Sequence, residues 1–207
     1  HPLDRSLLRN KGKDEWLKQA KFIQNNINKT TIDKAFAKMP EEVRGQANDE
    51  LKQTLLDRKD NLANLISKYY DMISKYVLIQ ATDKDDYIDV YRLENGKTKV
   101  EIYRNKGGDR EDRISQRSFD EDVTKEVWIY GLDDTDTFTI KGDGKSKTLV
   151  RLVGGHDNDE YIIENKKRLK IYDFKADKKA EKTGGAKLHL TNSYDQTRFL
   201  RNKKIYT

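Results

Sequence analysis

The sequence contains no cysteine, which excludes disulfides, thiol nucleophiles and thiolate metal sites. Long apolar runs are also missing, and none approaches the roughly 20 residues that a helix needs to cross a bilayer. Neither a P-loop nor a G-x-G-x-x-G segment occurs, and the three histidines show no metal-ligand spacing. Because no motif for these chemistries is present, we expect no enzyme active site in this chain.

The two signs of charge are interspersed along most of the sequence, which ends in a basic tail. Lysine and arginine number 42 and aspartate and glutamate 36, and the two signs alternate, as in KDDYIDVYR and GGDREDR. A nucleic-acid binder more often collects basic residues on one stripe with aromatic residues between them. We therefore expect no nucleic-acid partner. With 34% hydrophobic and 38% charged residues, the core must be lean and the surface strongly ionic.

The apolar spacing is helical from residue 14 to residue 76. A first stripe has steps of three and four, which stacks its members on one helix face: Trp16, Ala20, Ile23 and Ile27. A second stripe has a period near 3.5: Leu51, Leu55, Arg58, Leu62, Leu65, Tyr69, Met72 and Tyr76. It predicts an amphipathic helix that packs against the rest of the chain, with a two-stranded coiled coil as the alternative. We expect a helical subdomain over residues 1–76.

After Tyr76 the period of the pattern changes to two. Eight short segments are rich in β-branched and aromatic residues: VLIQ, YIDVYR, TKVEIYR, EVWIYG, TFTIKG, LVRLVGG, EYIIEN and LKIYDF. Asn95-Gly96, between the second and third segments, is typical of a hairpin turn. The polar, glycine-bearing stretches 105–118 and 175–187 are interpreted as exposed loops. The predicted fold class is α+β, with a β-rich domain over residues 77–207.

The β-rich part contains an internal repeat with four equivalent origins: Ala81, Gly131, Gly154 and Asp173. Apolar residues stand four and two positions before each origin, and the first three origins are followed five positions later by Asp86, Asp136 and Asp159. The repeated unit is therefore strand, acidic turn, strand, and the last copy keeps only its first strand. Units of this kind stack as coils that share one core, which predicts a β-roll or β-helix. An antiparallel β-sandwich with similar turns is the alternative.

The turn GGHDNDEYI nearly matches the calcium-binding nonapeptide G-G-x-G-x-D-x-U-x, with Asp157 in place of the third glycine. If the coils stack, six oxygen-bearing side chains of two adjacent turns meet and become candidate calcium ligands: Asp133, Asp134, Asp136, Asp157, Asn158 and Asp159. The alternative is a plain turn, in which Gly, Asn and Asp occur because they tolerate positive φ. We expect no other cofactor and no catalytic residue.

Six segments, in this order, resemble a family of large outer-membrane proteins, chiefly from Bacteroidetes: LDRSLLR, EWL…A, YYDMISKYVLIQATDKDDYIDVYRLENGKTKVEIY, FDEDVTKEVWIYGLDDTDTFTIKG, VRLVGGHDNDEYIIE and NSYDQTRF. In that family such a module lies between an N-terminal region, in some members a calcineurin-like metallophosphoesterase, and a C-terminal surface-antigen-type β-barrel. The resemblance implies a location in the periplasm or at the cell surface, tethered to the outer membrane through a parent protein. The resemblance also implies that the partners of this module are the flanking domains of its parent chain, including the outer-membrane β-barrel. The opening HPLDRSLL is typical of a piece of a longer protein. The phosphoesterase motifs do not occur, so that activity is not implied for any residue here.

The favoured hypothesis for the function is a non-catalytic spacer or interaction module. One alternative is a module that binds calcium or a polysaccharide, the latter lying across exposed aromatic residues such as Tyr91, Tyr103 and Trp128. Another alternative is an enzyme that acts on surface glycans or phosphoesters.

Overall fold

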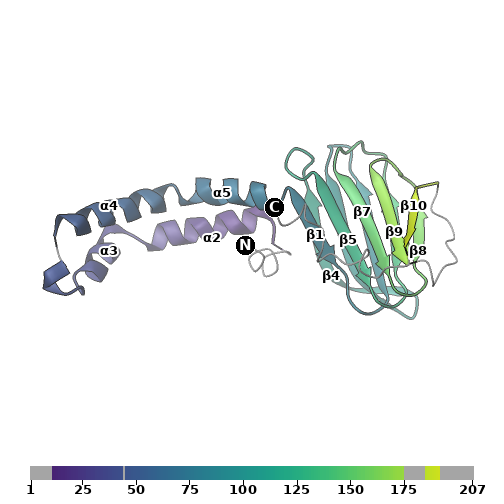
Figure 1. Cartoon of the computed structure of the whole chain (residues 1–207), viewed down its shortest axis with the longest axis horizontal. Coiled ribbons are helices and arrows are strands. Elements are labelled where there is room, and N and C mark those ends of the chain that lie inside the picture. Colours follow the sequence, from purple (N-terminus) through teal and green to yellow (C-terminus); the bar gives the residue numbers. More distant parts are fainter. Residues whose placement is uncertain (1–10, 44, 175–184, 192–207) are drawn as a thin grey trace. The chain divides into compact units, whose positions relative to one another are not determined.

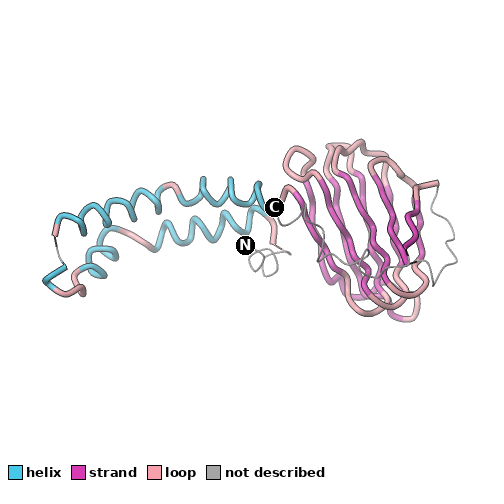
Figure 2. Tube along the Cα trace, in the orientation of Figure 1, coloured by secondary structure: helices cyan, strands magenta, loops and turns pink. Residues whose placement is uncertain are grey.

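The computed structural model describes residues 11–43, 45–174 and 185–191, and these residues fall into two compact units. Lys11–Met72 form a helical unit, and a β-rich unit begins at Ile73 (Figures 1 and 2). The predicted α+β class, with helices preceding a β-rich region, is confirmed. The division lies a few residues before the boundary that the sequence predicts after residue 76. The segments LDRSLLR and NSYDQTRF lie outside the described residues.

The helical unit has its α-helices in the order α2 (Lys13–Asn26), α3 (Lys29–Phe36), α4 (Gln46–Asp60) and α5 (Leu62–Ile73), with a 3₁₀ turn at Glu41–Val43. Two contacts hold α2 alongside α5 and the end of α4. The ring of Trp16 lies 5.8 Å from that of Tyr70, and Nε2 of Gln24 donates to the carbonyl oxygen of Lys59 at 2.9 Å. The helices therefore pack as an antiparallel hairpin, with Ala20 buried at the contact.

α4 and α5 follow one another along one line (Figure 1). The N–H of Asn61 donates to the carbonyl of Asp57 at 3.0 Å, and the N–H of Leu65 donates to the carbonyl of Asn61 at 3.1 Å. Both bonds have the i to i−4 spacing of an α-helix. Asn61 itself is the C-cap of α4, with φ −88° and ψ 0°, so α4 and α5 are two helices in line and not one unbroken helix.

The described residues of the β-rich unit form two five-stranded sheets. Its strands are β1 (Tyr76–Gln80), β2 (Asp86–Arg92), β3 (Thr98–Lys106), β4 (Asp109–Phe119), β5 (Glu126–Leu132), β6 (Thr137–Lys141), β7 (Leu149–Gly155), β8 (Glu160–Ile163), β9 (Leu169–Phe174) and β10 (Leu188–Thr191). The first sheet has the order β1-β5-β7-β9-β10 and is parallel, and the second has the order β4-β3-β2-β6-β8. The chain passes from the first sheet to the second in each coil, as β1–β2, β5–β6 and β7–β8.

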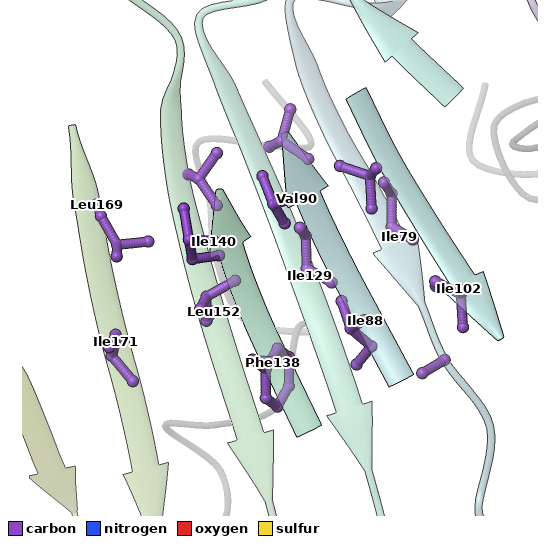
Figure 3. Packing of buried hydrophobic residues seen from close by; sticks show 14 of the residues in the cluster. Ile79, Ile88, Val90, Ile102, Ile129, Phe138, Ile140, Leu152, Leu169 and Ile171 are labelled. Carbon is purple, nitrogen blue, oxygen red and sulfur yellow. The ribbon is translucent and has the colours of Figure 1, made fainter. Parts of the chain in front are cut away.

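The strand register matches the repeat that the sequence predicts. Val77 pairs with Val127, Val127 with Val150, and Val150 with Leu169, while in the second sheet Ile88 pairs with Phe138. These side chains belong to one buried cluster, and Figure 3 shows residues of both sheets pointing toward each other. The β-roll prediction is confirmed by this parallel stacking. Among the described strands, antiparallel pairing, which the sandwich alternative requires, is limited to β2–β3–β4.

The predicted loop over residues 105–118 is wrong for most of its length. Gly107 and Gly108, with φ values of +65° and +96°, form a turn, and β4 then runs antiparallel to β3. β4 is an edge strand whose side chains are mostly exposed on both faces, so it shows no alternation of apolar and polar residues. Of the second predicted loop, residues 175–184 lie outside the described residues.

Candidate functional site

One aspartate from each of three coils forms a buried ladder where the chain crosses between the sheets. The N–H of Asp86 donates to Oδ1 of Asp136 at 2.8 Å, and the N–H of Asp136 donates to Oδ1 of Asp159 at 3.0 Å. The three residues are at most 5% exposed. Each carboxyl group therefore links the turn of its own coil to the turn of the neighbouring coil.

Glycine at two of the four repeat origins, Gly131 and Gly154, makes room for this ladder, whereas the first origin is Ala81. A Cβ atom at Gly131 would lie 2.1 Å from Oδ2 of Asp136, and one at Gly154 would lie 2.1 Å from Oδ2 of Asp159. The last copy has no turn aspartate in the repeat, and Asp173 of β9 supplies a carboxylate instead. Oη of Tyr161 donates to Oδ2 of Asp173 at 2.7 Å. The glycine at the repeat origin is thus explained by the close approach of a carboxyl group.

The electrostatics of the ladder keep at least one carboxyl group neutral. Burial is the main cause that raises the pKa of Asp136 to about 9. The negative charges of Asp159, Asp86 and Asp85 raise this pKa further, whereas the hydrogen bond from the Asp86 N–H lowers it. At the Asp86 end, Nη1 of Arg104 lies 3.2 Å from Oδ1 of Asp86. Because the ladder is buried, it lies out of reach of a substrate, and its chemistry is that of a structural hydrogen-bond network.

The structure separates the six predicted calcium ligands into two sets. Asp136 and Asp159 point inward and meet in the ladder, whereas Asp133, Asp157 and Asn158 are exposed on the turns. Asp134 is half-buried, and its Oδ2 lies 3.5 Å from Nζ of Lys84. Within the described ranges no group of three or more His, Cys, Asp or Glu residues could hold a metal ion. Calcium binding stays a prediction.

The plain-turn alternative has direct support from the backbone. Asp134 has φ +64° and Asp157 has φ +74°, which is the left-handed region that aspartate tolerates better than most residues. Asp157 thus adopts the conformation for which the nonapeptide uses its third glycine.

Arg92 is a buried residue that the sequence reading did not single out. It is 2% exposed and lies at the opposite edge of the coils, after the inward-facing Ile88 and Val90. Its Nη1 donates to the carbonyl of Thr148 at 3.0 Å and its Nη2 to the carbonyl of Arg168 at 3.0 Å. Burial, together with the charge of Arg168, lowers the pKa of Arg92 to about 10. Arg92 follows Ile88 and Val90 at a spacing of two, and this alternation was the sequence feature that could have predicted its inward position.

The outer face of the first sheet carries an aromatic cluster around Trp128. The Trp128 ring stacks near those of Tyr130 and Tyr172, with centroids 6.3 and 6.2 Å away. The guanidinium of Arg151 lies 4.8 Å from the ring centroid of Trp128. Tyr130 is 4% exposed and Trp128 is half-buried. Trp128 and Tyr172 are thus partly accessible on this face, and polysaccharide binding stays a prediction.

The outer face of the second sheet carries two neighbouring carboxylates on β2 and β3, Asp89 and Glu101. Each has a cation partner: Nη2 of Arg110 lies 3.1 Å from Asp89, and Nζ of Lys99 lies 3.3 Å from Glu101. The same Nζ of Lys99 is 4.4 Å from the ring centroid of Tyr91, so this predicted glycan-binding tyrosine already contacts a cation of the chain. Tyr103, the other tyrosine of that prediction, is half-buried on β3.

The helical unit, in contrast, exposes large apolar side chains along one line of α4 and α5. The second stripe of the sequence, as far as the helices carry it, is called here the apolar stripe: Leu51, Leu55, Arg58, Leu62, Leu65, Tyr69 and Met72. Leu51, Leu55, Leu65 and Met72 are 51%, 41%, 46% and 63% exposed. The prediction that this stripe packs against the rest of the chain is therefore wrong for these four residues. Trp16 of α2 instead packs against Tyr70 and against the half-buried stripe member Tyr69, with ring centroids 5.8 and 6.0 Å away.

Comparison with known protein families, characterised proteins and solved structures finds no match to this chain. Over the residues that the structure describes, no helix is both long enough and apolar enough to span a membrane. The apolar stripe is the feature of the described residues that most favours a binding role, because water meets its large apolar side chains directly.

Proposed function

We propose that this chain is a non-catalytic spacer and interaction module of a larger bacterial protein that is anchored in the outer membrane. The exposed apolar stripe carries the interaction part of the proposal. In a chain with 38% charged residues, four large apolar side chains on one helix face lie 41% or more exposed. Contiguous exposed apolar surface marks a docking site, and spacing near 3.5 residues fits a partner helix.

The β-roll supports the spacer part of the proposal. Its coils are joined by parallel strand pairs, by one continuous core and by the Asp86–Asp136–Asp159 ladder. Arg92 ties together the turns at the other edge. Because successive coils share these contacts, the roll resists bending between coils and can hold its two neighbours at a set distance.

The location in the outer membrane and the flanking domains as partners rest on the resemblance of the six ordered segments. The non-catalytic part of the proposal has support from the acidic clusters. The carboxyl groups of the ladder are buried in internal hydrogen bonds, and Asp89 and Glu101 are held in ion pairs.

A double substitution, Leu55→Gln with Leu65→Gln, tests whether the stripe is a surface. Because both side chains are exposed, we expect the free energy of unfolding of the helical unit to change by less than about 0.5 kcal/mol per site. The measurement is thermal unfolding followed by circular dichroism at 222 nm, at a dilution where the chain is monomeric.

The matched control is Ile32→Ala in α3, where Ile32 is 7% exposed. It is expected to destabilise the same unit by about 2 kcal/mol, because it removes a buried side chain. A cost of the double substitution as large as that of the control would show that the stripe is part of a core and would refute the interaction role.

A further inference from the structure

We propose that the partner of the apolar stripe is the same stripe on a second copy of this chain, in antiparallel orientation. This inference rests on the proposed function, namely that the stripe is a docking surface. The spacing supports it first. Steps of four and three alternate from Leu51 to Met72 across α4 and α5, which lie along one line on either side of Asn61 (Figure 1). This is the a/d spacing of a coiled-coil seam, which another helix with the same spacing fills.

The charged member of the stripe decides the orientation. Arg58 is exposed, and a parallel, in-register pair would place it against Arg58 of the second copy. Two guanidinium groups in one seam repel each other and would be desolvated without a partner. An antiparallel pair avoids this contact.

One antiparallel register satisfies the seam from Leu55 to Met72, and it leaves Leu51 without a helical partner, because its counterpart is Tyr76 of β1. With the two-fold axis between Leu62 and Leu65, these residues face each other across the seam, and Leu55 faces Met72 of the second copy. Arg58 then faces Tyr69 of the second copy, so the charge meets an aromatic ring and gains a cation–π contact. If the second copy is shifted by one heptad in one direction, Arg58 lies opposite Leu62. If it is shifted by one heptad in the other direction, the position opposite Arg58 lies beyond Ile73, where α5 ends.

The residues that flank the seam are compatible with this register. In the antiparallel pair, Lys59 lies opposite Ile66 of the second copy, and Lys68 lies opposite Asn61. No two like charges meet across the seam at these positions, and the lysine stems can cover the apolar layers beside them. The stripe is therefore self-complementary, as a two-fold interface requires.

The chain has no cysteine, so engineered cysteines report the register without interference. A chain that carries both Leu55→Cys and Met72→Cys is oxidised, and its products are separated without reductant. We expect a covalent dimer, because the two residues face each other across the seam. They are 17 positions apart on one helical line, about 25 Å, so a disulfide within one chain is excluded.

Single variants are the matched controls. Leu55→Cys alone or Met72→Cys alone is expected to give no covalent dimer, whereas mixing the two single variants restores it. A covalent dimer from Leu55→Cys alone would indicate a parallel pair and would overturn the proposal.

Sedimentation equilibrium of the unmodified whole chain gives the second readout. We expect a concentration-dependent dimer that Leu65→Glu abolishes, with unchanged ellipticity at 222 nm as the check of folding. A chain that stays monomeric at every concentration overturns the self-association. If the chain is monomeric and the stability of the Leu55→Gln, Leu65→Gln variant is unchanged, the stripe is still a docking surface, and its partner is a helix of another protein. If that variant is destabilised, both proposals fail.

Discussion

The N–H of Asp136 donates to Oδ1 of Asp159 at 3.0 Å, and this bond joins the turn of one coil to the turn of the next. The same relationship between Asp86 and Asp136 extends the ladder by a further coil. Each carboxyl group here bridges the backbones of two neighbouring turns, at the edge of the apolar core. The stacked turns therefore depend on acidic residues that have no access to solvent.

Replacing Asp136 with Asn is expected to stabilise the chain increasingly as the pH rises. The pKa of Asp136 is about 9 in the folded chain, whereas an exposed aspartate titrates near 4. Between these values the unfolded chain has lost a proton that the folded chain keeps, so this group lowers the free energy of unfolding with rising pH, by up to about 1.4 kcal/mol per pH unit. Asn cannot ionise and retains an oxygen for the Asp86 N–H.

The measurement for Asp136→Asn is urea unfolding of both proteins at pH 5, 6, 7 and 8. The stability difference should move in favour of the variant across this range. A difference that is constant with pH would show that Asp136 is ionised in the folded chain, contrary to the burial of its side chain.

Replacing Gly154 with Ala is expected to destabilise the β-rich unit by about 3 kcal/mol. A Cβ atom there would lie 2.1 Å from Oδ2 of Asp159 and 2.4 Å from Oη of Tyr161, so the ladder would have to shift. Urea unfolding is followed by the fluorescence of Trp128 in a Trp16→Phe background, because these are the two tryptophans of the chain.

Gly12→Ala, in the helical unit and followed by circular dichroism at 222 nm, serves as the control for the cost of a methyl group where there is room for it. A Cβ atom at Gly12 meets no heavy atom within 4 Å, and the residue is the N-cap of α2. We expect a change below about 1 kcal/mol. Equal effects of the two substitutions would mean that the coils absorb the added methyl group and that the close approach is not required.

Much of the β-roll could be predicted because its signals are local and repeated. Val77, Val127 and Val150 stand at the same offset before their turns, and the structure pairs them side by side. β4 could not be found in this way. An edge strand that is wetted on both faces shows no alternation, so its polar sequence reads as a loop.

The candidate site was only partly predictable for a different reason. Asp136 and Asp159 were expected to meet, but whether a turn carboxylate points inward or outward depends on the packing of the coils around it. The apolar stripe was predicted as a helix face, yet a coiled-coil seam and a core-facing stripe have nearly the same spacing. The exposure of Leu51 and Leu65 depends on the position of α2 in the tertiary structure, which the spacing of apolar residues does not determine.

Replacing Arg92 with Met is expected to destabilise the β-rich unit by about 3 kcal/mol. The substitution removes the donors to the carbonyls of Thr148 and Arg168; the Thr148 oxygen is buried, whereas that of Arg168 still accepts from the N–H of Val150. Arg92→Lys should recover only part of the loss, since one ammonium group cannot reproduce the planar fork of the guanidinium. Urea unfolding in the Trp16→Phe background measures both. Full recovery by Lys would show that charge alone, and not the geometry of the guanidinium, holds the two turns.

Substitutions at Asp134 distinguish a plain turn from a calcium site. Asp134 has φ +64°, so Asp134→Gly relieves the backbone while it removes the exposed contact with Lys84, and we expect a change within about 1 kcal/mol. Asp134→Val places a β-branched side chain in the same left-handed conformation and should cost about 2 kcal/mol. The melting temperatures of the unmodified chain and of Asp134→Gly are then compared with millimolar calcium and with chelator. For a plain turn neither protein responds to the ion. A melting temperature that rises with calcium in the unmodified chain and not in Asp134→Gly would make Asp134 a ligand and would restore the calcium hypothesis.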